Sequence, residues 1–207
     1  MSVQNLTRSE MPQVLRHLRT LSPDDRRLRF GRSMNQRALE SYVNRIDFSV
    51  DKAFGIFNSE MRLIAFAHLA LHGAKGFAEL GLSVSPDHRR EGHGEALLRR
   101  AALHVSNLGL RVIYMHCLSE NEGMMRLAQK AGFKVVPEGI EADATRSVER
   151  ATLKSISQEV LCDQIALVDS IFRRQLNTLR RIATLKKFFS RLKRLSRAAK
   201  VRRAPQY

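Results

Sequence analysis

The sequence predicts an α/β (α+β) fold, in which a mixed central sheet is flanked by helices and followed by a basic C-terminal helical arm. Over roughly three quarters of the 207 residues, short apolar stretches of strand length alternate with stretches of helical periodicity. Two glycines lie between one of these strands and the clearest amphipathic helix. The last quarter carries most of the net positive charge, which separates an appendage from the body.

The N-terminal half supplies helices first and strands second. Ser22 caps a helix whose first turn contains Pro23 and two acidic residues, a typical helix start. A turn-like Asn-Ser-Glu separates the first two strands, and Pro86 follows the third. In chain order, we expect helices over 9–21, from residue 22 and over 35–46, and strands over 54–57, 63–71 and 77–84.

The second half of the body continues the alternation. The helix expected over 95–108 has a clear apolar face, and Arg99 and Arg100 lie beyond that face, so we expect both in solvent. Gly132 provides the left-handed residue that commonly ends a helix. The remaining elements are a strand over 111–117, a helix over 121–131 and strands over 133–136 and 148–156.

Composition limits the function classes. Hydrophobic residues make up 43% of the chain, enough for a core, and two cysteines do not imply a disulfide framework. The net charge of +16 favours anionic partners, such as nucleic acid, acidic membrane surfaces or phosphorylated cofactors. The N-terminus lacks the pattern of a secretory signal, and the longest apolar run, 63–71, is too short to span a bilayer. We therefore expect a cytoplasmic protein.

The glycine-containing loop, "HRREGHGE", has the chemistry of an anion cradle. A helix N-terminus has free N–H groups and a partial positive charge, and Gly92 and Gly94 let an anion approach the main chain. Arg89 and Arg90 add formal charge. Leu97 replaces the third glycine of a dinucleotide-binding motif, and no G-K-[ST] follows as in a P-loop. The alternative is a glycine-rich turn with solvated arginines.

Two motifs together resemble the GNAT superfamily of N-acetyltransferases. The segment "RREGHG" matches that family's [RQ]-x-x-G-x-[GA] element between a strand and a helix, and "NEGMMRLAQKAGF" matches its Asn-led helix ending in Gly-Phe. Both have the order and separation typical of the family, and the resemblance covers roughly residues 3–157. It is closest to the catalytic domain of bacterial protein-lysine acetyltransferases.

The resemblance implies a V-shaped opening between two splayed parallel strands, 77–84 and 111–117, that holds acetyl-CoA or another short acyl-CoA as co-substrate, without a metal. Backbone groups on the first strand would bind the acetyl and pantetheine parts, and the glycine loop would bind the pyrophosphate. The cofactor-binding residues implied are Leu82, Val84, Arg89, Arg90, Gly92, His93, Gly94, Glu95 and Asn121.

Glu79 is the candidate general base. An alkylamine is mostly protonated at pH 7, so a base must remove its proton before attack. Glu79 shares a strand face with Gly81, which would leave room for substrate, and apolar neighbours would raise the pKa of the carboxyl. The alternative is a surface glutamate paired with a cation. His116 is the second candidate for the base, and Cys117 is a weaker candidate for a nucleophile.

One departure from the family pattern concerns the general acid. Many members have a tyrosine in the Asn-led helix that protonates the leaving thiolate, and the matching position here is Ala128. Tyr114 should point into the packing of the sheet, and Ser119 or a water remains a candidate. A thiolate is a tolerable leaving group, so activity need not depend on the tyrosine.

The sequence divides into a GNAT domain, 1–160, and a basic amphipathic extension, 161–207. Residues 163–207 contain 13 Lys and Arg against 2 Asp, and apolar residues recur every three or four positions from Phe172. Residues 172–207 could bind nucleic acid or an acidic membrane surface, with nucleoid or peripheral membrane association, or pack in a homodimer; the alternative is a disordered, solubilising tail. Asp163 and Asp169 suggest that the first part docks on the body. A degenerate acyl-CoA sensor is the competing function. The amine acceptor is left open, with a protein lysine as the first candidate and a polyamine disfavoured by the net charge.

Overall fold

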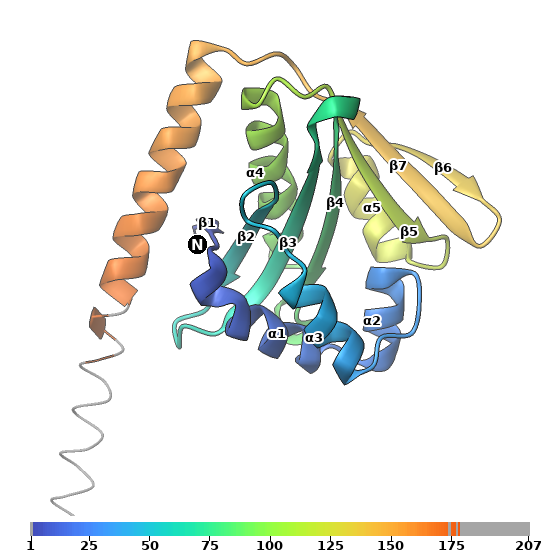
Figure 1. The fold of residues 1–207 in the computed structure, drawn as a ribbon, viewed down its shortest axis with the longest axis horizontal. Coiled ribbons are helices and arrows are strands. Elements are labelled where there is room, and N and C mark those ends of the chain that lie inside the picture. The colour runs from blue at the N-terminus through green and yellow to red at the C-terminus, as the bar shows by residue number, and fades with distance from the viewer. Residues whose placement is uncertain (1, 174, 177, 179–207) are drawn as a thin grey trace, which may run out of the picture.

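The computed structural model describes residues 2–173, 175–176 and 178, and its centre is one seven-stranded mixed sheet (Figure 1). The strand order is β1-β2-β3-β4-β5-β7-β6, and only the β4–β5 pair is parallel. The strands are β1 (Gln4–Asn5), β2 (Lys52–Phe57), β3 (Leu63–His72), β4 (Phe77–Val84), β5 (Val112–Leu118), β6 (Lys134–Glu138) and β7 (Glu141–Ser147). The named helices are α1 (Met11–Thr20), α2 (Pro23–Phe30), α3 (Gln36–Asn44), α4 (His93–Asn107) and α5 (Glu122–Lys130).

Helices cover both faces of the sheet, as the predicted fold class requires. One hydrophobic cluster joins the sheet to α4 and α5, with Leu80, Leu82 and Leu97 among its buried members. A second cluster joins the opposite face to α1 and α3, with Val14, Leu39 and Phe66 fully buried. Because neighbouring residues of a strand point to opposite faces, β4 directs Leu80 and Leu82 to the first cluster and Glu79, Gly81 and Ser83 to the second side.

The helix boundaries follow the caps visible in the sequence. The Ser22 hydroxyl accepts a hydrogen bond from the amide of Asp25 at 3.0 Å, so α2 begins where its cap predicts. Asn35 caps α3 in the same way. Gly132 has φ of +80° directly after α5. α4 begins at His93, two residues before the predicted start, because Gly92 rather than Glu95 provides the non-helical N-cap.

The strand predicted over 148–156 is wrong. The last strand is β7, which ends at Ser147, and a helix begins at residue 153. β7 pairs with β5 along its whole length and buries Ala142 and Ala144, whose small side chains give only a weak apolar signal. The helix occupies 153–173 and is continuous through residue 160, where the sequence placed the end of the body.

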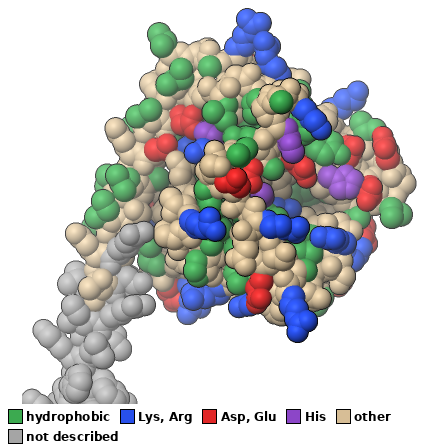
Figure 2. All heavy atoms as spheres, in the orientation of Figure 1, with side chains coloured by type: hydrophobic (Ala, Val, Ile, Leu, Met, Phe, Trp, Pro, Cys, Tyr) green, Lys and Arg blue, Asp and Glu red, His purple; other side chains and the backbone are tan. Residues whose placement is uncertain are grey.

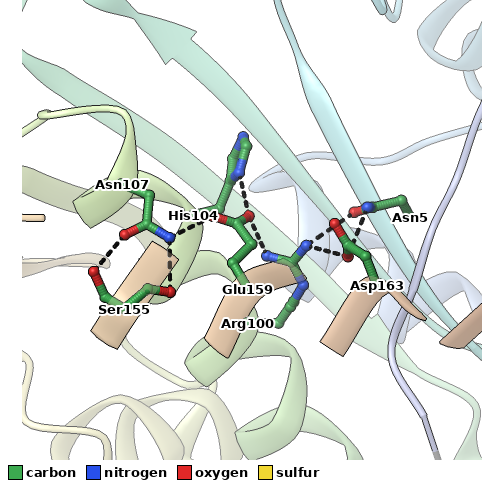
Figure 3. A network of polar contacts seen from close by, with 7 residues as sticks. All are labelled: Asn5, Arg100, His104, Asn107, Ser155, Glu159 and Asp163. Atoms are coloured by element: carbon green, nitrogen blue, oxygen red, sulfur yellow. Dashed lines mark hydrogen bonds and ion pairs between the residues drawn. The ribbon is translucent and has the colours of Figure 1, made fainter. Parts of the chain in front are cut away.

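Helix 153–173 is fixed to the body by a buried arginine (Figure 3). The guanidinium of Arg100 on α4 donates to Glu159 and Asp163 at 2.6 Å each. Only 5% of Arg100 is exposed, so its expected place in solvent is wrong, whereas Arg99 is exposed as predicted. The docking expected from the acidic residues is confirmed for Asp163, and Asp169 accepts a hydrogen bond from Ser2.

Most of the predicted basic amphipathic stripe lies outside the described residues. Within them, helix 153–173 leaves Leu153, Val168 and Phe172 largely exposed on the side that does not touch the body. No helix in the described part of the chain is long and apolar enough to cross a membrane.

Candidate active site

A gap opens between β4 and β5 in the middle of the sheet. The two strands pair in parallel only from Phe77↔Val112 to Glu79↔Tyr114, and beyond Glu79 they no longer pair with each other. β4 stays paired with β3 to its end, and β5 stays paired with β7. The strands therefore diverge, as the resemblance implied, and the C-terminal half of β4 has one unpaired edge.

The main chain of Leu82 and Val84 faces this gap. In an antiparallel pair, alternate residues exchange both backbone hydrogen bonds with the neighbouring strand. Ser85 donates to the carbonyl of Ile64 at 2.8 Å, so the register assigns Ser83 and Gly81 to the bonded positions against β3. The N–H and C=O groups of Leu82 and Val84 consequently point away from β3, toward the space that β5 has left.

The glycine loop leads from this gap to the N-terminus of α4. Gly92 is the N-cap residue with φ of +81°, and Arg90 has φ of +63°. The first hydrogen bond of the helix joins the amide of Ala96 to the carbonyl of Gly92, and no side chain caps the helix. The amides of residues 93–95 thus lack an intrahelical partner, which is the arrangement that binds phosphate groups.

Gap and loop form one cavity of about 670 Å³. Leu28 and Arg29 of α2 and Met124 and Leu127 of α5 complete its wall. All nine residues predicted to bind cofactor line this cavity, namely Leu82, Val84, Arg89, Arg90, Gly92, His93, Gly94, Glu95 and Asn121. The structure therefore brings together residues from β4, the glycine loop, α4 and the start of α5.

Several of these side chains also hold the cavity wall together. Arg89 forms an ion pair with Asp25 at 2.7 Å. Partial burial favours a higher pKa for Asp25, but hydrogen bonds from Arg89 and Ser22 outweigh it and the pKa is lowered. Glu95 pairs with Lys130 at 2.8 Å, and Asn121 caps α5 by accepting a hydrogen bond from the amide of Met124. These side chains thus fix α2 and α5 around the loop.

Gly92 and Gly94 must each be glycine, but for different structural reasons. A Cβ on Gly92 would meet no atom within 4 Å, so its requirement is the positive φ angle. A Cβ on Gly94 would lie 2.7 Å from Cδ2 of Leu127, so this glycine lets α5 approach α4 closely. Only Gly92 therefore shapes the loop through its backbone conformation.

Glu79 lies beside the cavity, not in its wall. Its side chain is 53% exposed, and its carboxylate is 4.0 Å from Nε2 of His72. The expected apolar enclosure is not formed, because the side chain is exposed and has polar neighbours, Tyr114 on β5 and His72 on β3. Glu79 does face the same side of the sheet as Gly81 and Ser83, next to the point where β4 and β5 separate.

Arg29 is a residue of the site that the sequence did not reveal. Its guanidinium covers Gly81 so closely that a Cβ on Gly81 would lie 2.1 Å from Nη2. The space left by Gly81 is thus occupied by Arg29, which corrects the expectation that it is open to substrate. Nothing in the local pattern of α2 distinguishes Arg29 from Arg26 or Arg27, because the contact depends on how α2 packs over β4.

His17 supports β4 from the same side. Its Nε2 is 2.9 Å from the Ser83 hydroxyl, and its Nδ1 is 3.2 Å from the Ser85 hydroxyl. Burial lowers the pKa of His17 to about 4, so the imidazole is neutral at neutral pH. A neutral ring that bridges two hydroxyls fixes the strand beside the gap without adding charge.

The other candidates for catalysis are less suited to it. Hydrogen bonding to Asp143 raises the pKa of His116, so a smaller fraction of it is the free imidazole that could accept a proton. Burial raises the pKa of the Cys117 thiol, which disfavours a thiolate nucleophile. Tyr114 does not point into the packing of the sheet, which corrects that expectation; its hydroxyl donates to Asp143 at 2.5 Å.

No hydroxyl of α5 reaches the cavity from the position of the family tyrosine. Ala128 is 1% exposed and belongs to the core. Ser119 donates to the carbonyls of Gly139 and Glu141, so it braces the end of β5, and it is not among the residues that line the cavity.

One group of side chains in the loop could hold a metal ion. Potential ligand atoms of His88, Glu91 and His93 all lie within 4.8 Å of one another, and this is the only such group among the described residues. Glu91 is 3.0 Å from Nε2 of His93. His93 is buried while Glu91 is exposed, so the group lies at the outer rim of the loop.

Strands β4 and β5 diverge, the main chain of β4 is unpaired along the gap, and the N-terminus of α4 has free amides. Together these features define a fold that is suited to bind acyl-CoA, and comparisons with known proteins agree. The sequence model of the acetyltransferase (GNAT) family matches residues 17–133. The chain belongs to this family and is an acetyltransferase. No curated protein matches its sequence.

Solved structures have the same fold at low sequence identity. The GNAT domain of S. lividans PAT superposes with a TM-score of 0.61 and 18% identity, over 70% of this chain and 89% of that one. Spermidine N-acetyltransferase from Vibrio cholerae, in complex with CoA and spermine, gives 0.57 and 18%, over 70% and 94%. A phosphinothricin acetyltransferase from Sinorhizobium meliloti, in complex with AcCoA, gives 0.59 and 14%, over 73% and 90%.

Proposed function

We propose that the protein transfers an acetyl group from acetyl-CoA to a primary amine, on a protein lysine or a small molecule, by direct attack of the amine. The observation that carries the proposal is the continuous path from the unpaired main chain of β4 to the free amides at the start of α4. Similar solved structures contain CoA or AcCoA, which supports an acyl-CoA co-substrate.

Different residues of the cavity would bind different parts of the cofactor. The free amides at residues 93–95 and the positive charge of Arg90 would bind the pyrophosphate. The pantetheine arm would extend along Leu82 and Val84 and bond their main-chain groups as an additional strand does. An N–H group in the gap would also donate to the thioester oxygen and stabilise the negative charge that develops there during attack.

Glu79 would act as the general base. The attacking nitrogen needs a free electron pair, so an ammonium must first lose a proton, directly to the carboxylate or through a water. Attack then forms the N–C bond and breaks the C–S bond, and the CoA thiolate leaves. Because the position of the family tyrosine is the buried Ala128, we propose that solvent protonates the thiolate.

The test is release of CoA thiol from acetyl-CoA with a panel of primary amines. Glu79→Gln should lower kcat/KM for the amine by about 10²- to 10⁴-fold, the usual contribution of a general base, while leaving the KM for acetyl-CoA unchanged. Glu138→Gln, an exposed change on β6, should leave both constants unchanged. Tight cofactor binding without turnover on any amine would instead favour an acyl-CoA sensor.

A further inference from the structure

Arg29 is a cation whose hydrogen-bonding capacity the protein does not use. Its Nε is buried and has no hydrogen-bond partner. Nη2 makes one long contact, 3.4 Å to the hydroxyl of Tyr42, and no carboxylate in the described chain lies within 4.0 Å of the guanidinium. A buried donor without a partner destabilises the fold, so a ligand that satisfies it would bind with a corresponding gain.

No carboxylate of the described residues pairs with Arg29 on this face, although the charges of Glu79 and Asp51 both act on Tyr42, and Asp51 is hydrogen-bonded to His68. Burial raises the pKa of Tyr42, which therefore keeps its proton, and lowers the pKa of both His17 and His68. Arg29 stacks over the ring of Phe30 at 4.9 Å, which places its plane without neutralising it. The nearest acidic side chain on α2, Asp25, is already paired with Arg89.

Arg29 lies on the acceptor side of β4. It contacts Gly81 on the face opposite the one that packs on α4, and it lines the cavity together with Ser83. Glu79 is two residues along the same strand on the same face, a separation of about 7 Å along the backbone. The charges of Glu79 and Arg29 both act on the hydroxyl of Tyr42, so the two residues border one region.

The carboxylate of Glu79 and the unpaired guanidinium of Arg29 are complementary to a ligand that carries both an amine and a carboxylate. Figure 2 shows several basic side chains over α2 and α3, and acidic, histidine and basic side chains mixed over β5 to β7. We infer that the acceptor is a small amine that also carries a carboxylate, as an amino acid does, and that Arg29 binds this carboxylate while Glu79 faces the amine. The inference rests on the proposed acetyl transfer and names its acceptor class. Arginine suits this role because its planar fork binds a carboxylate through two parallel hydrogen bonds.

The test compares each amino acid of a panel with its carboxamide. Both have the same amine, but only the acid can bind Arg29 through a charged pair. The carboxamide lowers the pKa of the amine and so increases the reactive free base, which biases the comparison against the inference. We expect the acids to have a kcat/KM roughly 10- to 100-fold above their amides, the usual effect of a charge-assisted hydrogen bond.

Variants of Arg29 and its neighbours test whether Arg29 causes the preference for acids. Arg29→Gln should lower kcat/KM for the acids to about that for their amides, which removes the preference for acids, and Arg29→Lys should retain some preference. Gly81→Ala should weaken the preference too, because the new Cβ would displace the guanidinium. Arg26→Gln is the matched control, since Arg26 lies on α2, donates to the carbonyl of Met34 and does not line the cavity.

Each possible result of these measurements supports or overturns the inference. A preference for amides, or a preference for acids that survives in Arg29→Gln, would overturn it. A raised KM for acetyl-CoA in Arg29→Gln would assign Arg29 to the cofactor instead. Turnover of a lysine-containing peptide, with none of any amino acid or amide, would overturn the acceptor class and leave the proposed function intact; no turnover with any amine would overturn both.

Discussion

Among single residues, Gly92 determines whether the loop amides can face the cavity. A residue with a Cβ at a φ of +81° carries about 1–2 kcal/mol of strain, which the loop relieves by turning the peptide. Cofactor binding would have to restore the strained form, so Gly92→Ala should raise the KM for acetyl-CoA about 5- to 30-fold.

Gly109 offers a matched control for this measurement. It follows α4, has φ of +75° and, like Gly92, has no atom within 4 Å of a built Cβ. Gly109→Ala should cost similar stability in urea unfolding but leave the KM for acetyl-CoA unchanged. Equal effects of both variants on that KM would mean that the cradle does not depend on the conformation of Gly92.

His17 predicts a pH dependence of stability. Its pKa falls from 6.5 unfolded to about 4 folded, so between these values the unfolded state binds more protons. The stabilisation is complete above pH 6.5 and is lost as the pH falls through 4, amounting to about 3 kcal/mol. Urea unfolding of wild type and His17→Gln from pH 7 to 4 tests this: the variant should lose much less stability over that range, and equal losses would contradict it.

At the scale of elements, helix 153–173 depends on one arginine. Arg100 holds Glu159 and Asp163, while Glu159 also accepts hydrogen bonds from Asn107 and lies 2.7 Å from His104 (Figure 3). Removing Arg100 takes the cation away from Glu159 and Asp163, which then retain their contacts with His104, Asn107 and Asn5. Losing hydrogen bonds to a charged group typically costs about 1.5–3 kcal/mol. Arg100→Gln should therefore release the helix.

Hydrogen exchange measures that release directly. In Arg100→Gln, amides of helix 153–173 should lose protection, whereas those of β3 and β4 should keep it because their pairing is unaffected. Arg99→Gln is the control, an exposed neighbour on α4 whose change should alter stability by no more than about 0.5 kcal/mol. A protected helix in Arg100→Gln would show that apolar contacts alone hold it.

For the whole molecule, the cavity and helix 153–173 are formed by separate parts of the chain. Every described residue that lines the cavity lies between Leu21 and Lys130. A chain that ends at residue 178 keeps helix 153–173 and its contacts with Arg100, and should retain the KM for acetyl-CoA of the full chain. A raised KM would indicate that the residues after 178 take part in cofactor binding.

The sequence predicted the parts of the site that local patterns encode. The strand, the glycine loop and α4 are adjacent in the chain, and the family resemblance assigned eight cofactor residues to them and Asn121 to the start of α5; all nine line one cavity. Arg29 was missed because its contact with Gly81 joins α2 to β4 and leaves no mark in either segment. The burial of Arg100 was missed because its acidic partner Glu159 comes 59 positions later. β7 was misplaced because its buried side chains are alanines.

The orientation of the β4 backbone has a consequence for how this enzyme can evolve. The groups at Leu82 and Val84 that face the gap are amides and carbonyls, which every residue except proline supplies in full. Substitutions along this edge can alter packing but cannot remove these main-chain groups, so in the proposed function the cofactor contacts would tolerate sequence drift. Acceptor recognition would instead depend on the side chains of Arg29 and Glu79, where a single codon change could redirect the enzyme to a new amine.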